Sequence, residues 1–206
     1  TDFTKSINLN PQDARYYRLL SQAIMIKLSN DLNNKADKTP AKERSQKLQN
    51  LATSGVDVAK RATDIDQNNV ENWINRGLIY QNLVGVVGGT DQAAVSMYQE
   101  ALKRSPNDPA IYYSIGSIYL TIAENSRLLA TNNQAGTNAD ALKKQAVDSF
   151  RKAEENYKKA IELNNNYGQA LFALGVVYER EGKLLDAIKQ FEKLRVGNPN
   201  DPSIAF

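Results

Sequence analysis

Apolar and small residues recur at helical spacing along this chain, and the pattern is clearest between residues 167 and 199. There it predicts two amphipathic helices joined by a short turn at 181–183. The apolar face of the first helix carries Leu171, Leu174, Gly175 and Tyr178. That of the second carries Ala187, Phe191 and Leu194. The two faces predict a packed hairpin, which ends near Pro199 because proline cannot continue a helix.

The same spacing returns three more times. The first helices of these hairpins carry Tyr17, Leu20, Ser21 and Ile24, then Trp73, Gly77 and Tyr80, then Tyr112, Ile115, Gly116 and Tyr119. The second helices carry Gly55, Ala59 and Ala62, then Ala94, Tyr98 and Ala101, then Ala153, Tyr157 and Ala160. This spacing resembles the tetratricopeptide repeat, whose pattern is W-x2-L-G-x2-Y, then A-x3-F, then P. Departures from that pattern include Leu171 in place of Trp, Arg76 in place of Leu, Ser21 in place of Gly and Ala59 in place of Phe.

The hairpins differ in length. Their lengths can be compared by the number of residues from the small residue of the first helix to that of the second. This distance is 34 residues from Ser21 to Gly55 and 17 from Gly77 to Ala94. It is 37 residues from Gly116 to Ala153 and 12 from Gly175 to Ala187. Apolar residues continue through the two long insertions, so we expect taller helices with flexible tips near 33–39 and 131–138. The short insertion falls in the Gly-rich stretch 84–89.

The resemblance implies an all-α fold, a right-handed α-solenoid of helix-turn-helix hairpins, some with elongated helices. We expect a single solenoid domain over residues 1–206. Its predicted segments are the end of a truncated repeat at 1–11, repeats at 12–67, 68–107, 108–166 and 167–200, and the start of a truncated repeat at 201–206. Because no hairpin buries its apolar face alone, exposed terminal repeats invite self-association.

The composition argues against catalysis. The chain contains neither His nor Cys, which removes the commonest general base, the commonest metal ligand and every disulfide. Neighbouring carboxylates such as Glu154 and Glu155 diverge on a helix, and the glycines at 85–89 are not followed by the Gly-Lys-Ser/Thr of a phosphate-binding loop. We therefore predict no catalytic residues, no metal site and no cofactor, and we expect that the chain is not an enzyme.

The charge pattern excludes further classes. The net charge of +3 is too small a bias to predict a nucleic-acid partner, and no apolar run approaches the ~20 residues that span a bilayer. The absence of Cys fits both a cytosolic and an extracytoplasmic location. Basic residues gather near Lys38, Lys42 and Arg44 and again near Lys143 and Lys144. We expect these clusters to be solvated hairpin tips, with contact to anionic lipid or glycan as the alternative.

In the tetratricopeptide family, a stripe on each first helix lines the concave surface of the solenoid. The equivalent positions here are Arg18, Gln22 and Met25, then Ile74, Leu78 and Gln81, then Tyr113, Ser117 and Leu120, then Phe172, Val176 and Glu179. The middle of this stripe is apolar and aromatic, so we predict a groove for a peptide or partner segment, anchored by Tyr113 and Phe172. The alternative is that some of these residues pack against a neighbouring hairpin.

The resemblance thus implies a non-catalytic protein–protein interaction scaffold. Two alternatives stay open. The uneven hairpins and the stretch 79–89 are similar to the soluble C-terminal repeat regions of bacterial membrane proteins of the O-antigen ligase and polymerase type. That resemblance implies an accessory region, outside the membrane, of a glycan-handling enzyme. Exposed terminal repeats imply instead an oligomerisation module.

Overall fold

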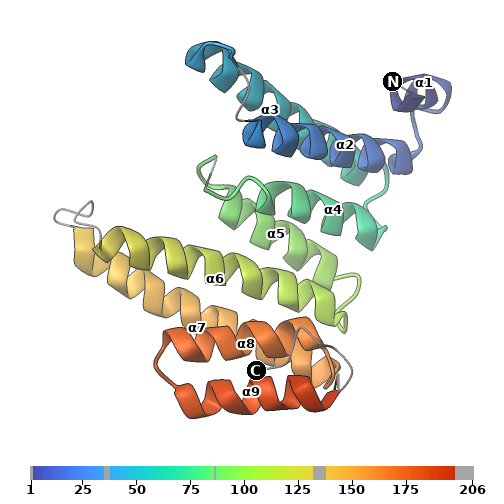
Figure 1. Ribbon diagram of the computed structural model, residues 1–206. Helices are drawn as coiled ribbons and strands as arrows, with labels where there is room; N and C mark the ends of the chain where they lie inside the picture. Colours follow the sequence, from blue (N-terminus) through green and yellow to red (C-terminus); the bar gives the residue numbers. More distant parts are fainter. Residues whose placement is uncertain (1, 35–37, 86, 132–137, 198–206) are drawn as a thin grey trace. The chain divides into compact units, whose positions relative to one another are not determined.

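The computed structural model describes residues 2–34, 38–85, 87–131 and 138–197, and most of that length is helical (Figure 1). The first five helices are α1 (Asp2–Leu9), α2 (Ala14–Asn33), α3 (Ala41–Ile65), α4 (Val70–Gln81) and α5 (Thr90–Leu102). The others are α6 (Pro109–Thr131), α7 (Ala139–Leu163), α8 (Gly168–Arg180) and α9 (Leu184–Gly197). The described residues form no strand, so the predicted all-α class is confirmed.

The helices gather into two compact units. Unit 1 is Thr1–Pro106 and holds α1 to α5, and unit 2 is Asn107–Phe206 and holds α6 to α9. In unit 1, α2 packs on α3 and α4 packs on α5, and α4 also lies against α2 and α3. In unit 2, α6 packs on α7 and α8 packs on α9, and α8 also lies against both α6 and α7. The assignment of residues 1–206 to one domain stays a prediction.

The helices begin at residues that satisfy free backbone amides. Asp13 caps α2, where its carboxylate accepts a hydrogen bond from the Arg15 amide at 3.0 Å. Asn69 caps α4 in the same way, accepting from the Glu71 amide at 3.0 Å. α6 opens with Pro109, whose missing amide hydrogen costs nothing in the first turn of a helix. These local signals place the helix starts that the periodicity predicts.

Small residues let the two helices of a hairpin approach closely. Gly116 on α6 faces the buried ring of Tyr157 on α7, and a Cβ atom there would lie 2.6 Å from the ring. Gly175 on α8 faces the ring of Phe191 on α9 in the same manner, at an even closer distance. The pairing of a small residue with an aromatic ring is therefore the contact that closes each of these hairpins.

The two long insertions extend helices, as expected. α2 and α3 have 20 and 25 residues, against 12 and 13 in α4 and α5. α6 and α7 have 23 and 25 residues, and Figure 1 shows their ends extending beyond α8 and α9 in unit 2. The predicted flexible tips fall largely on residues 35–37 and 132–137, which lie outside the described residues. Pro199 and the truncated repeat at 201–206 also lie outside them.

Candidate partner-binding surfaces

The predicted stripe begins in unit 1 with two polar residues of α2 that are engaged within the fold. Arg18 donates from Nη1 to Oδ1 of Asn72 on α4 at 3.0 Å. Gln22 donates from Nε2 to Oδ1 of Asn75, also on α4, at 2.9 Å. Both side chains therefore join neighbouring first helices, which matches the alternative that some stripe residues pack between hairpins.

The two asparagines of α4 form the buried centre of this polar contact. Asn72 also donates to the carbonyl oxygens of Ala62 at 3.2 Å and Asp66 at 2.9 Å, which tie α4 to the end of α3. Asn75 donates to the hydroxyl of Ser21 at 2.9 Å. Asn72 and Asn75 are both buried, so their hydrogen bonds are obligatory rather than optional. The two asparagines are visible in the sequence as polar residues within an amphipathic helix. Their partners on α2 are more than fifty residues away in the sequence, so helical spacing could not identify them.

Beside this contact lies a hollow on the α2 and α4 face of unit 1. It encloses about 460 Å³, and its lining includes Gln22 and Met25 from α2 and Leu78 from α4. Three positions of the predicted stripe thus meet at one concavity. Ile26, which is 63 % exposed, and Leu78, which is 41 % exposed, supply apolar surface at its rim. We call this site the α2/α4 hollow.

The remaining stripe positions of α4 are not among the residues that line this hollow. Ile74 is half-buried on α4. Gln81, at the end of α4, accepts a hydrogen bond from the hydroxyl of Tyr98 at 2.8 Å, so it fixes α5 against α4.

In unit 2, the stripe of α6 is packed among aromatic rings. The ring of Tyr113 lies 5.8 Å from that of Tyr157 and 5.8 Å from that of Tyr167. Ser117 donates to the carbonyl oxygen of Tyr113 at 2.9 Å and accepts from the hydroxyl of Tyr157 at 3.4 Å. Burial raises the pKa of the Tyr157 hydroxyl well above its usual range, so that group stays protonated. Leu120 packs against the same core.

The stripe of α8 is more open. Phe172 is 53 % exposed, and its ring centre lies 5.8 Å from that of Phe191. Val176 is half-buried and Glu179 is exposed. A groove running through Ile74, Tyr113 and Phe172 would draw on both units, and it stays a prediction.

The basic cluster near the tip of α2 and α3 has a structural role. Arg44 on α3 donates from Nη2 to the carbonyl oxygens of Asp31 and Leu32, each at 3.0 Å, at the end of α2. Carbonyl groups in the last turn of a helix lack a partner within the helix, and a cation is favourable at a helix C-terminus. Lys47 adds an ion pair with Asp31 at 3.1 Å. Arg44 and Lys47 therefore hold the end of α2 against the beginning of α3.

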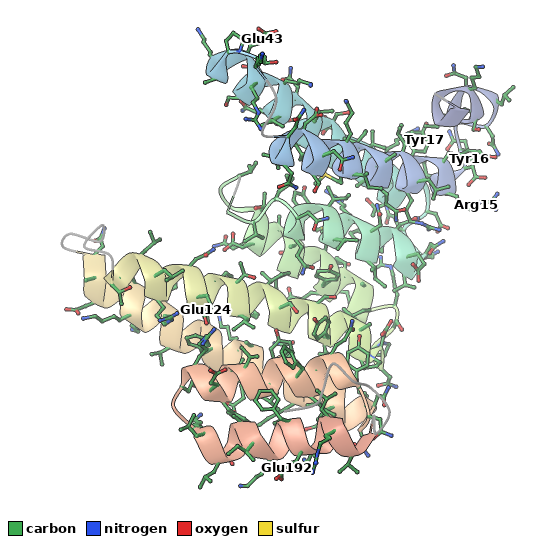
Figure 2. All side chains as sticks on the ribbon, viewed as in Figure 1. Arg15, Tyr16, Tyr17, Glu43, Glu124 and Glu192 are labelled. Carbon is green, nitrogen blue, oxygen red and sulfur yellow. The ribbon has the colours of Figure 1, made fainter. Side chains whose placement is uncertain are left out.

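In the part of the chain that the structure describes, no group of three or more His, Cys, Asp or Glu side chains could hold a metal ion. The carboxylates with lowered pKa values are members of ion pairs: burial opposes ionisation of Glu124, but hydrogen bonds from Arg127 and Arg180 outweigh it and lower the pKa. Glu124, labelled in Figure 2, lies on α6, and Arg180 lies on α8, so this pair joins two helices of unit 2. Among the described helices, none has the length and apolar character needed to cross a membrane.

Comparison with known proteins places this fold. A family model described as a tetratricopeptide repeat matches residues 138–202. The human protein O-mannosyl-transferase TMTC3 is 27 % identical over 146 residues, which cover 65 % of this chain and 16 % of that protein. The chain thus spans less than a fifth of this curated relative. These matches give no support to the resemblance to O-antigen ligase and polymerase regions.

Two solved structures share the architecture. MamA aligns with a TM-score of 0.58 and 18 % identity over 96 % of this chain and 85 % of its own. TTC0263, a tetratricopeptide repeat protein of Thermus thermophilus, aligns with a TM-score of 0.60 and 18 % identity over 98 % of this chain and 82 % of its own. Proteins built from these repeats generally mediate protein–protein interactions, and their scaffold is generally non-catalytic. A tetratricopeptide repeat is thus matched within residues 138–202, and the fold shared with these two solved structures confirms the predicted helical solenoid.

Proposed function

We propose that this chain is a non-catalytic scaffold that binds an apolar segment of a partner protein at the α2/α4 hollow. The observation that carries the proposal is the meeting of Gln22, Met25 and Leu78 at one concavity. These residues occupy the stripe positions that line the concave surface in the tetratricopeptide repeat family. The exposed side chains of Ile26 and Leu78 add an apolar rim of the kind that anchors a helix or extended peptide.

The lining of the α2/α4 hollow favours an apolar partner segment, because none of its described residues is charged. Its lining combines apolar side chains with the uncharged polar groups of Gln22, Ser29 and Asn82. A charged anchor would lose its hydration there without gaining a partner of opposite sign. Amide and hydroxyl groups at the edge can instead satisfy the backbone of a bound segment.

A displayed library of helical peptides, selected for binding to the intact chain, tests the proposal. Leu78→Glu and Ile26→Glu each place a carboxylate at the rim, and we expect each to weaken the selected peptides by about 2 kcal/mol or more, as for the centre of an interface. The matched control is Val147→Glu, at an exposed position of α7 in unit 2. It should leave the affinity unchanged. Equal affinity for the unaltered chain and all three variants would exclude the α2/α4 hollow as the binding site.

A second candidate role is oligomerisation. α9 exposes four large apolar side chains, namely Leu184, Leu185, Ile188 and Val196. Apolar surface of this density on one helix is characteristic of an interaction face.

The role of an accessory region in a larger glycan-handling protein rests on one observation. The human relative is an O-mannosyl-transferase, and the matched region is 16 % of it. Apolar membrane spans elsewhere in the parent gene would support this role, and a parent made of repeats alone would exclude it.

A further inference from the structure

A larger hollow lies elsewhere on unit 1, beside α3. It encloses about 720 Å³, a volume within the range of small-molecule sites. Its described lining comes from residues 45–56 of α3, from Leu32 at the end of α2, from Tyr80 of α4, and from the connection that leads to Thr90 of α5. We call it the α3 hollow. Leu32 is the one lining residue that it shares with the α2/α4 hollow.

The wall that α3 contributes follows the helical repeat. Leu48, Ala52 and Val56 recur every four residues and form an apolar stripe, and Ser45, Gln49 and Thr53 form a polar stripe beside it. Together the two stripes extend over roughly 16 Å of helix, given the rise of about 1.5 Å per residue. The hollow therefore has one apolar side and one side of uncharged hydrogen-bonding groups.

The opposite wall is the connection between α4 and α5, which is longer than the connection between α8 and α9. Leu83, Val87, Gly88, Gly89 and Thr90 line the hollow there. Gly89 has a φ of +76°, which glycine adopts without strain, and it ends the connection as the N-cap of α5. A Cβ atom added at Gly88 or Gly89 would meet no other atom within 4 Å, so the space beside this backbone is open.

The equivalent positions of α7 in unit 2 carry different side chains. When Gly55 of α3 is aligned with Ala153 of α7, Ala52 corresponds to Phe150 and Val56 corresponds to Glu154. Phe150 is buried in the core of unit 2. Glu154 accepts a hydrogen bond from the hydroxyl of Tyr178 at 3.2 Å and lies 3.6 Å from the ammonium of Lys183. Unit 1 thus has a methyl group where unit 2 has a phenyl ring, and apolar side chains where unit 2 has an ion pair.

The chemistry of the α3 hollow limits what can bind. Every described residue that lines it is uncharged, so an ionised ligand would lose its hydration without compensation. Leu48, Val56, Leu83 and the ring of Tyr80 offer apolar contact, and an aromatic ligand can pack against Tyr80. A hydroxyl or carbonyl of the ligand can face Ser45, Gln49 or Thr53.

We propose that the α3 hollow is a binding site for an uncharged small molecule with an aromatic ring. The aromatic ring of the ligand occupies the space next to Ala52. In unit 2, the equivalent position on α7 carries the phenyl group of Phe150. The polar edge of the ligand lies along Ser45, Gln49 and Thr53. Apart from Leu32, which lines both hollows, this site is separate from the partner-binding surface proposed for the α2/α4 hollow.

The test uses the intact chain and the uncharged dye N-phenyl-1-naphthylamine, whose fluorescence rises in apolar surroundings. We expect saturable binding, with amide NMR shifts concentrated at Gly88, Gly89 and Thr90. Ala52→Phe fills the hollow and should weaken the dye at least about tenfold. Thr53 lies at the exposed rim of the hollow, and the equivalent residue of α7 is Arg151. Thr53→Arg should therefore weaken dye binding by a similar factor without disturbing the core.

Controls separate this site from others. Val147→Phe adds a ring at an exposed position of α7 and should leave the dye affinity unchanged. Leu78→Glu, in the α2/α4 hollow, should also leave it unchanged. Naphthalene-2-methanol should compete with the dye at least about tenfold better than 2-naphthoate or 2-naphthylmethylammonium, because the charged analogues must be desolvated.

Three results would overturn the proposal: no saturable dye binding, equal affinity in Ala52→Phe, Thr53→Arg and the unaltered chain, or equal competition by the charged analogues. Loss of dye binding in Leu78→Glu alone would assign the dye to the α2/α4 hollow and would equally refute a site at α3. Thermal unfolding monitored by circular dichroism checks that each variant is folded.

Discussion

Gly116 shows how one residue sets the distance between the two helices of a hairpin. Its α-carbon faces the ring of Tyr157, which is fully buried and donates a hydrogen bond to Ser117. The ring has no room to withdraw, because protein cores are close-packed. Alanine is the better helix former by about 1 kcal/mol, yet the contact requires glycine.

We therefore expect Gly116→Ala to lower the free energy of unfolding by about 1 to 3 kcal/mol, the usual cost of overpacking. Urea denaturation followed by circular dichroism measures this change. Gly88→Ala is the matched control, because a Cβ atom there meets open space, and it should stay within about 0.5 kcal/mol of the unaltered chain. If Gly116→Ala proved as stable as the unaltered chain, the close approach of α6 and α7 would be wrong.

At the scale of elements, α8 is attached to its neighbours by charges as well as by its apolar face. Arg180 at its end pairs with Glu124 of α6 at 2.7 Å. Tyr178 donates to Glu154 of α7 at 3.2 Å, and Lys183 in the following turn lies 3.6 Å from the same carboxylate. The carboxylate of Glu154 thus joins α7 both to α8 and to the turn before α9.

The pH dependence of stability tests the role of Glu154. Burial opposes ionisation, but hydrogen bonding from Lys158 and nearby positive charge outweigh it and lower the pKa of Glu154 below its ordinary value of 4.5. A carboxyl group with a lowered pKa in the folded state stabilises the fold above pH 4.5 and loses that effect as the pH falls through the folded-state pKa. Glu154→Gln should therefore cost roughly 1 kcal/mol at neutral pH, and the difference from the unaltered chain should shrink in acid.

Thermal or urea unfolding at several pH values measures this effect. Glu155→Gln is the control, because the Glu155 pair with Arg151 is exposed and should contribute less than about 0.5 kcal/mol. A difference between Glu154→Gln and the unaltered chain that stayed constant with pH would contradict the assignment.

At the scale of the whole molecule, the surface is defined by what successive hairpins leave uncovered. Helix α8 packs against α7, and Phe150 of α7 is buried. The equivalent residue of α9 is Leu184, which is 60 % exposed. Leu185 and Ile188 extend this apolar surface. Repeat proteins gain stability when such a face is covered by a neighbouring helix.

We expect the chain to self-associate through this face of α9. Sedimentation velocity over a wide concentration range should show an increasing average mass, and Leu185→Lys combined with Ile188→Lys should shift the chain toward monomer. Val147→Lys, at an exposed position of α7, should leave the association unchanged. A strict monomer at every concentration would exclude oligomerisation by this route.

The sequence alone predicted the hairpins and their unequal lengths. These follow from local periodicity: Gly116 and Tyr157, or Gly175 and Phe191, stand at fixed positions in a repeated code, and helical geometry converts that spacing into a shared face. The sequence also placed Gln22, Met25 and Leu78 on one stripe, but it did not distinguish lining a hollow from packing between hairpins.

Only the tertiary structure decided that question, because the answer depends on partners distant in the chain. Arg18 is engaged by Asn72, whereas Leu78 opens onto a hollow. The α3 hollow arises only when long helices lie against a shorter hairpin with a glycine-rich connection. Periodicity describes one helix at a time, and a cavity is a property of the space between several.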